Sequence, residues 1–162
     1  MILNEDFGNQ SYLSHNLGCN CEACTVGIDS VKQQQQKLME TIGWYAHMIA
    51  NDPEHPFNVN YHTHGIPESF KHKNFQVCFP MRMDTIHTII THLVDRVKNG
   101  EVFYPGQILK DVLKSTSDTE MPITFLDITI KDEKCLRVIF PDENGEVLKE
   151  KISDQYTPQW NK

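Results

Sequence analysis

Hydrophobic and polar positions along the chain alternate between the period of a helix and the period of a strand. The clearest helical pattern covers residues 84–99, where apolar side chains recur every three or four positions. A second helix is predicted over 29–42, with Asp29 as its N-cap and Gly43 as its left-handed stop. A third, short helix is predicted over 108–113. Two main helices and one minor helix are therefore expected.

Extended segments account for most of the remaining chain. Strands are predicted at 44–50, 57–64, 75–79, 123–130 and 135–140, and a tight turn at 142–145 leads into a last one at 147–148. The order predicts an α+β fold, a single domain with a mainly antiparallel sheet of five to six strands packed on one face by the two main helices. Residues 1–27 are predicted to form an irregular arm, 28–156 the domain, and 157–162 a tail that frays.

The first two predicted strands form a hairpin whose two faces differ in chemistry. If Ala46 pairs with Tyr61, one face is almost entirely apolar. The other face then collects Tyr45, His47, Asn58, Asn60, His62 and His64. A slip of one residue would mix the two sets and bury polar groups, so this register is favoured. It places His47 opposite Asn60 and Tyr45 opposite His62.

His62 and His64 lie two residues apart in a strand, so their side chains point to the same side of the sheet. Imidazole binds metal ions and changes its charge near neutral pH. Three interpretations follow from the pair. It binds a metal with His47 or a carboxylate as third ligand, it performs acid–base chemistry with Tyr45 as partner, or it belongs to a solvated face with neither role. Glu68 is the only carboxylate near the pair in sequence.

A second candidate site lies in the N-terminal arm. Cys19, Cys21 and Cys24 place three thiols within six residues, close enough to share one ion. Zinc favours four Cys or His ligands, and His15 is the nearest fourth ligand, with Cys78 as an alternative. The spacing differs from the paired motifs of a zinc ribbon, so free thiols are the competing interpretation.

Composition limits the class of protein. The 162 residues fit one domain, and 39% hydrophobic with 23% charged residues indicates a globular chain. A net charge of −7 argues against nonspecific binding to nucleic acid or to an anionic membrane surface. No apolar run approaches the ~20 residues of a membrane span, and the first residues do not read as a secretory signal. A cytoplasmic location is expected.

The order of several short motifs resembles the bacterial domain-of-unknown-function 4262 family over roughly residues 19–107. The motifs are Cys21-x-x-Cys24, Gly43-Trp44, Pro56-Phe57, Thr63-His64-Gly65, and an amphipathic helix ending at Gly100 and followed by Phe103 and a turn at Gly106. The resemblance implies a small bacterial cytosolic α+β protein in which Trp44, Phe57 and Gly65 hold the fold together. It brings no established activity.

Three functions agree with these observations, and they leave open whether the protein is an enzyme. The first is a metal-binding protein, with zinc as the expected ion and ligands among Cys19, Cys21, Cys24, His15, His62 and His64. The second is a regulatory or immunity module that binds another protein or a second copy of itself. The third is a small hydrolase that uses the histidine face. No other cofactor is expected, because the chain has neither a glycine-rich phosphate loop nor a nucleophile elbow.

Overall fold

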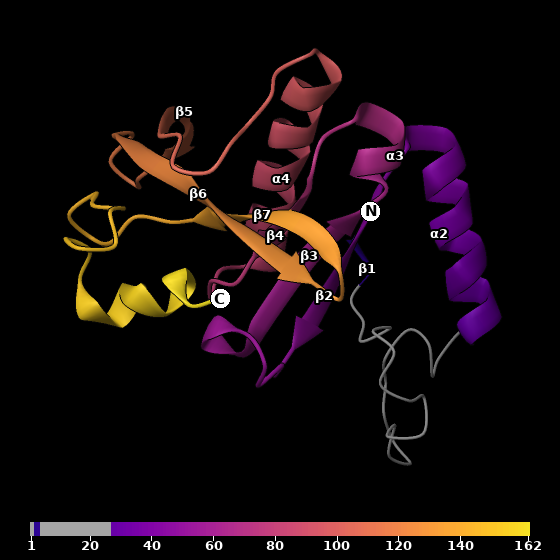
Figure 1. Ribbon diagram of the computed structural model, residues 1–162, viewed down its shortest axis with the longest axis horizontal. Helices are drawn as coiled ribbons and strands as arrows, with labels where there is room; N and C mark the ends of the chain where they lie inside the picture. The colour runs from indigo at the N-terminus through magenta and orange to yellow at the C-terminus, as the bar shows by residue number, and fades with distance from the viewer. Residues whose placement is uncertain (1, 4–26) are drawn as a thin grey trace.

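A mixed β-sheet forms the centre of the fold (Figure 1). The computed structural model describes residues 2–3 and 27–162, and in these residues seven strands follow the order β1-β2-β3-β4-β7-β6-β5. The strands are β1 (Ile2–Leu3), β2 (Tyr45–Ala50), β3 (Val59–His64), β4 (Asn74–Val77), β5 (Leu109–Lys114), β6 (Glu120–Ile130) and β7 (Glu133–Ile139). Four of the six pairings are antiparallel, while β1–β2 and β4–β7 are parallel. The predicted single α+β domain with a mainly antiparallel sheet is confirmed. The two-residue β1 adds an edge strand that was not expected.

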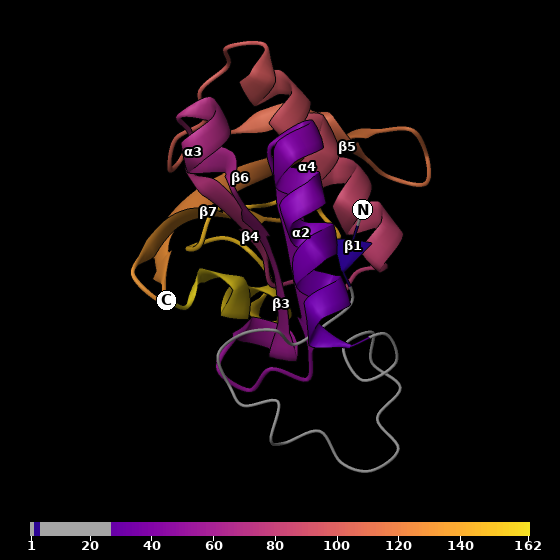
Figure 2. The ribbon, with the colours of Figure 1, turned by 90° about the vertical axis from the view of Figure 1, so that its right-hand side faces the viewer.

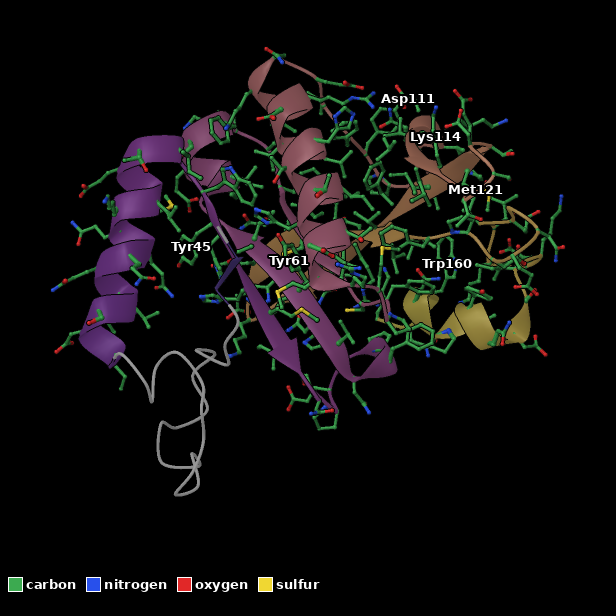
Figure 3. The ribbon with its side chains drawn as sticks, turned by 180° about the vertical axis from the view of Figure 1, so that it is seen from behind. Tyr45, Tyr61, Asp111, Lys114, Met121 and Trp160 are labelled. Atoms are coloured by element: carbon green, nitrogen blue, oxygen red, sulfur yellow. The ribbon has the colours of Figure 1, made fainter. Side chains whose placement is uncertain are left out.

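Helix α4 (Met83–Lys98) covers the apolar face of the sheet, behind it in Figure 1 and in front of it in Figure 3. Its buried side chains meet a core that includes Ala46, Tyr61 and Phe75. The six buried residues of α4 are Ile86, Ile89, Ile90, Leu93, Val94 and Val97. Each such side chain contributes about 1.5–3 kcal/mol through its removal from water. The predicted amphipathic helix is therefore confirmed.

Helix α2 (Ile28–Ile42) does not join α4 on the apolar face, so the prediction of both helices on one face was wrong. It runs beside the β1–β2 end of the sheet (Figure 2). Its Gln35 is hydrogen-bonded to His47, whose side chain points away from the apolar face. Its buried Val31 is not part of the core cluster beneath α4. The two helices thus lie on opposite faces of the sheet.

The pairing of β2 with β3 differs by two residues from the predicted register. Ala46 pairs with Thr63 and His47 with His62, because the extended chain starts at Val59 and not at Phe57. Phe57 and Asn58 have φ angles of 56° and 55° and belong to the short 3₁₀ turn η2 (Pro56–Asn58). A shift of two residues preserves the two faces, so the predicted separation of apolar and polar side chains holds while the predicted partners were wrong.

Two local predictions in the second half were also wrong. The segment predicted as a helix over 108–113 contains most of strand β5 (Leu109–Lys114), which completes the sheet beside β6 with an irregularity between Leu109 and Leu113. Val147 and Leu148 form no strand. The carboxylate of Asp142 accepts hydrogen bonds from the backbone N–H groups of Asn144 and Glu146, which closes this turn on itself.

The remaining elements are α3 (Ile66–Phe70), which follows β3, and the C-terminal 3₁₀ helix η3 (Asp154–Trp160). The tail was predicted to fray, yet Gln159 is 1% exposed. Its side chain pairs with both backbone groups of Phe140. Among the residues that the structure describes, no helix has the length and apolar character to cross a membrane.

Candidate metal centre

Three histidines from two neighbouring strands meet on the side of the sheet opposite α4. His47 of β2 lies directly across from His62 of β3, and His64 follows two residues later on the same face. Their ring centroids are 5.5 Å apart for His47–His62, 4.8 Å for His47–His64 and 4.7 Å for His62–His64. All three pairs meet edge to face. The alternation of the strands thus aims three imidazoles at one point.

The cluster is enclosed, which excludes the prediction of a solvated histidine face. His47 is 6% and His62 9% exposed, and His64 is half-buried. Burial, with a smaller contribution from the neighbouring histidines, lowers the pKa of His47 to about 3 and that of His62 to about 2. Burial also lowers the pKa of His64, although Glu133 opposes the shift. All three imidazoles are neutral near pH 7, the form that binds a metal.

Within the part of the chain that the structure describes, two buried nitrogens of this cluster have no hydrogen-bond partner. They are Nδ1 of His62 and Nε2 of His64. A buried polar atom without a partner costs about 1–3 kcal/mol. One ligand atom from each of the three histidines lies within 4.8 Å of the others. Nitrogens bound to one zinc ion in a tetrahedron are about 3.4 Å apart, so small ring rotations would bring the three nitrogens to that spacing.

Side chains from distant parts of the sequence surround the cluster. Nε2 of His47 is 2.9 Å from the side-chain nitrogen of Gln35 in α2. The ring of Tyr45 stacks on His64 with a centroid separation of 5.1 Å, and burial raises the pKa of its phenol. Figure 3 shows Tyr45 on the side of α2, well apart from Tyr61 near α4. On the outer side of His64, the Glu133 carboxylate lies 3.7 Å from Nδ1.

A polar row continues from the histidines across the sheet. His62 pairs with Gln76, which in turn pairs with Arg137 on β7. The amide of Gln76 donates to Asn60 Oδ1 at 2.9 Å and accepts from Arg137 Nε at 2.7 Å. Arg137 is 2% exposed. Its Nη1 also donates to the backbone carbonyls of Gln159 and Asn161, so this end of the row holds the C-terminal segment.

A surface pocket of about 500 Å³ lies between α3, the segment that follows it, and the first residues of β4 and β7. Asn74 and Glu133 belong to its wall. Asn74 Nδ2 donates to the Glu133 carboxylate at 3.3 Å, and that carboxylate faces His64. The other lining residues are Pro67, Glu68, Lys71, His72, Lys73 and Lys134. The pocket therefore adjoins the outer side of the histidine cluster.

The predicted site residues divide into two groups. The structure brings His62 and His64 together and adds His47, one of the third ligands considered from the sequence. His15, Cys19, Cys21 and Cys24 lie outside the described residues, so the arm site stays a prediction. Cys78 is buried and carries a free thiol. Burial raises the pKa of Cys78 to about 12.

Sequence reasoning missed Gln35 and Glu133. Nothing in the local pattern of Gln35 distinguishes it from the neighbouring glutamines at 33, 34 and 36 in the predicted helix. Glu133 begins a strand that pairs in parallel with β4, and this pairing joins residues 61 positions apart in the sequence. Only the sheet order could have placed it beside His64.

Comparison with known proteins gives one match. The family profile described as "Domain of unknown function (DUF4262)" matches residues 38–149. No curated protein and no solved structure matches the chain. The matched segment contains the three histidines and Glu133, begins after the cysteine motif, and extends beyond the range expected from the sequence motifs. Because it covers more than half of the 162 residues, the chain belongs to the DUF4262 family.

Proposed function

We propose that this protein binds one divalent metal ion, zinc first, through His47, His62 and His64. The observation that carries the proposal is the pair of buried nitrogens without partners, Nδ1 of His62 and Nε2 of His64, inside a cluster of three neutral imidazoles. If the three rings only packed against one another, the two buried nitrogens would have lost their hydrogen bonds to water without gaining a partner. A metal ion would offset that loss with two bonds. Imidazole is a ligand for zinc, copper, iron and nickel. Zinc is the ion to test first, and the other three metals are tested after it.

Three protein ligands leave a coordination position open on zinc, as in catalytic zinc sites. Hydrolysis is therefore a second candidate function, favoured by the pocket beside Glu133 and Asn74. In that case the turnover of ester or phosphoester substrates would rise and fall with zinc content. Activity that persists at full rate after the metal is removed would contradict this candidate.

The metal content of protein purified without added metal tests the main proposal. We expect close to one zinc ion per chain by elemental analysis. After removal by a chelator, zinc returned to the protein should bind at a single site, and cobalt should produce the visible absorption of a nitrogen-rich centre. The absence of zinc, together with no binding by the metal-free protein, would contradict the proposal.

Matched variants locate the site. His64→Gln and His62→Gln should weaken zinc binding by at least 100-fold, because each removes one of three ligands. His92→Gln is the control, since His92 is exposed on α4, and it should bind as the wild type does. Cys21→Ala tests the arm, because loss of zinc in this variant alone would place the metal there. Circular dichroism must show that each variant is folded.

A regulatory or immunity module that binds a protein partner remains a competing prediction. Among the described residues, the exposed large hydrophobic side chains are Ile42, Val102, Tyr104, Ile108 and Leu148. Three of them lie within residues 102–108, which is the segment to mutate if a partner is found.

A further inference from the structure

The two nitrogens of His64 have different surroundings. Nε2 is buried and has no hydrogen-bond partner among the described residues, and His64 is one of the three histidines of the cluster. Nδ1 faces the carboxylate of Glu133 at 3.7 Å. A carboxylate has only acceptor atoms, so it repels a bare imidazole lone pair and attracts an N–H group. In the neutral ring the proton therefore belongs on Nδ1, which leaves the lone pair on Nε2, the buried nitrogen of the ring.

Glu133 is itself held in place. Asn74 Nδ2 donates to Glu133 Oε2 at 3.3 Å. The other end of the same amide is fixed, because Asn74 Oδ1 accepts from the Thr63 hydroxyl at 3.2 Å and from the Ile66 N–H at 3.4 Å. Asn74 is 2% exposed. A half-exposed carboxylate is thus directed toward His64 by a side chain in the interior.

We propose that Glu133 is a positioning residue of the metal centre: it holds His64 with the proton on Nδ1 and so presents Nε2 to the metal. The inference rests on the function proposed above. The unpartnered atoms further assign the mode of binding, since His64 would bind through Nε2 and His62 through Nδ1.

The distance of 3.7 Å between Nδ1 and the carboxylate exceeds that of a hydrogen bond. A cation bound to Nε2 withdraws electron density from the ring and makes Nδ1–H a stronger donor. The contact is therefore expected to shorten when the metal binds. The carboxylate in turn makes Nε2 more basic, as carboxylates behind metal-bound histidines do. A surface contact of this carboxylate without such a role would contribute little, and it would not require the inner nitrogen to be left without a partner.

Glu133→Gln tests the inference, because it removes the charge and retains an oxygen that can accept from Asn74. The control is Asp132→Asn, one residue earlier in the turn that precedes β7, where φ is 70° and asparagine is tolerated. We expect Glu133→Gln to weaken zinc binding about 10- to 100-fold, and Asp132→Asn to change it less than twofold. Both variants should unfold at the wild-type urea concentration, since Glu133 is exposed.

Nitrogen-15 NMR of the histidine rings in metal-free protein provides a second measurement. Wild-type His64 should carry its proton on Nδ1, and Glu133→Gln should yield a mixture of both tautomers. A wild-type His64 protonated on Nε2, or an unchanged zinc affinity in Glu133→Gln, would overturn the inference. Failure of the wild-type protein to bind zinc would instead contradict the proposed function, while the tautomer measurement still tests whether Glu133 orients His64.

Discussion

At the scale of single residues, the histidine cluster makes stability depend on pH in a defined direction. His47 and His62 have an ordinary pKa of 6.5, and burial lowers it to about 3 and about 2. Between these values and 6.5 the unfolded chain binds protons that the folded protein does not bind. Their contribution to stability is therefore complete above pH 6.5 and is lost as the pH falls below it.

For metal-free protein we predict that each of these two histidines lowers the free energy of unfolding by about 2 kcal/mol between pH 7 and pH 5. Urea unfolding at several pH values in the presence of a chelator measures the slope. The His62→Gln variant should lose about half of the slope that His47 and His62 contribute together, and His92→Gln is the matched control. Equal slopes in wild type and His62→Gln would show that His62 takes up its proton in the folded state.

The residue scale also shows how far the sequence could predict the site. The pair His62 and His64 could be predicted because strand alternation alone places both rings on one side. His47 could be placed on the same face, but not opposite His62, because the left-handed conformations of Phe57 and Asn58 displaced the register. The Glu133 contact depends on the order of strands in the sheet, which local pattern does not contain.

At the scale of elements, the junction between α2 and the β3–α3 turn depends on Gly65. Its φ is +91°, and a Cβ atom built there would lie 2.3 Å from Met39 Sδ and 2.8 Å from the carbonyl oxygen of Gly43. The same carbonyl accepts a 2.7 Å hydrogen bond from Ser69 Oγ in α3. The end of α2 therefore packs against this turn at backbone distance, and only glycine satisfies both the dihedral angle and the space.

We predict that Gly65→Ala costs more than Gly100→Ala. Both glycines have positive φ, +91° and +93°, but the space around Gly100 is open. The left-handed conformation lowers the free energy of unfolding of each variant by about 1–2 kcal/mol. The steric overlap lowers that of Gly65→Ala by roughly 1–3 kcal/mol more. Chemical denaturation of both variants measures the difference, and equal losses would mean that α2 moves away without cost.

The elements that could be predicted from the sequence are those whose apolar side chains recur at regular intervals. The apolar face of α4 and the alternation in β2 and β3 are repeated over several turns or residues, so tertiary contacts do not override them. Residues 108–113 are different, because the irregular pairing of β5 with β6 breaks the alternation that would have marked a strand. The predicted position of α2 was wrong because an apolar stripe on a helix does not indicate which face of the sheet the helix packs against.

At the scale of the whole molecule, Arg137 connects the centre of the sheet with the C-terminus. Its buried guanidinium donates to Gln76 and to the backbone carbonyls of Gln159 and Asn161. Burial lowers the pKa of Arg137. In the described part of the chain no carboxylate pairs directly with it, so neutral oxygens alone compensate the buried charge. Removal of the side chain leaves these acceptors buried and frees the C-terminal segment.

We predict that Arg137→Met destabilises the protein by about 3 kcal/mol, because it leaves several buried acceptors without their charged donor. Residues 154–162 should then exchange amide hydrogens faster and become accessible to proteases. Arg82→Met is the matched control, since the Arg82 side chain is 82% exposed, and it should change stability by less than about 0.5 kcal/mol. A C-terminal segment that stays protected in Arg137→Met would show that Gln159 and the packing of η3 suffice to hold it.

The Arg137→Met variant also tests whether the two ends of the polar row act independently. Gln76 stands between His62 and Arg137 in the sheet, and Arg137 contacts none of the three histidines through its hydrogen bonds. If the histidines form a metal site of their own, Arg137→Met should loosen the C-terminus and leave zinc affinity within about threefold of the wild type, because neither a ligand nor its carboxylate has changed. If zinc affinity falls with the loss of the C-terminal segment, the site extends along the whole row. In that case the segment at 154–162 is part of the metal centre's enclosure, and a truncation after residue 153 should reproduce the loss with Arg137 intact.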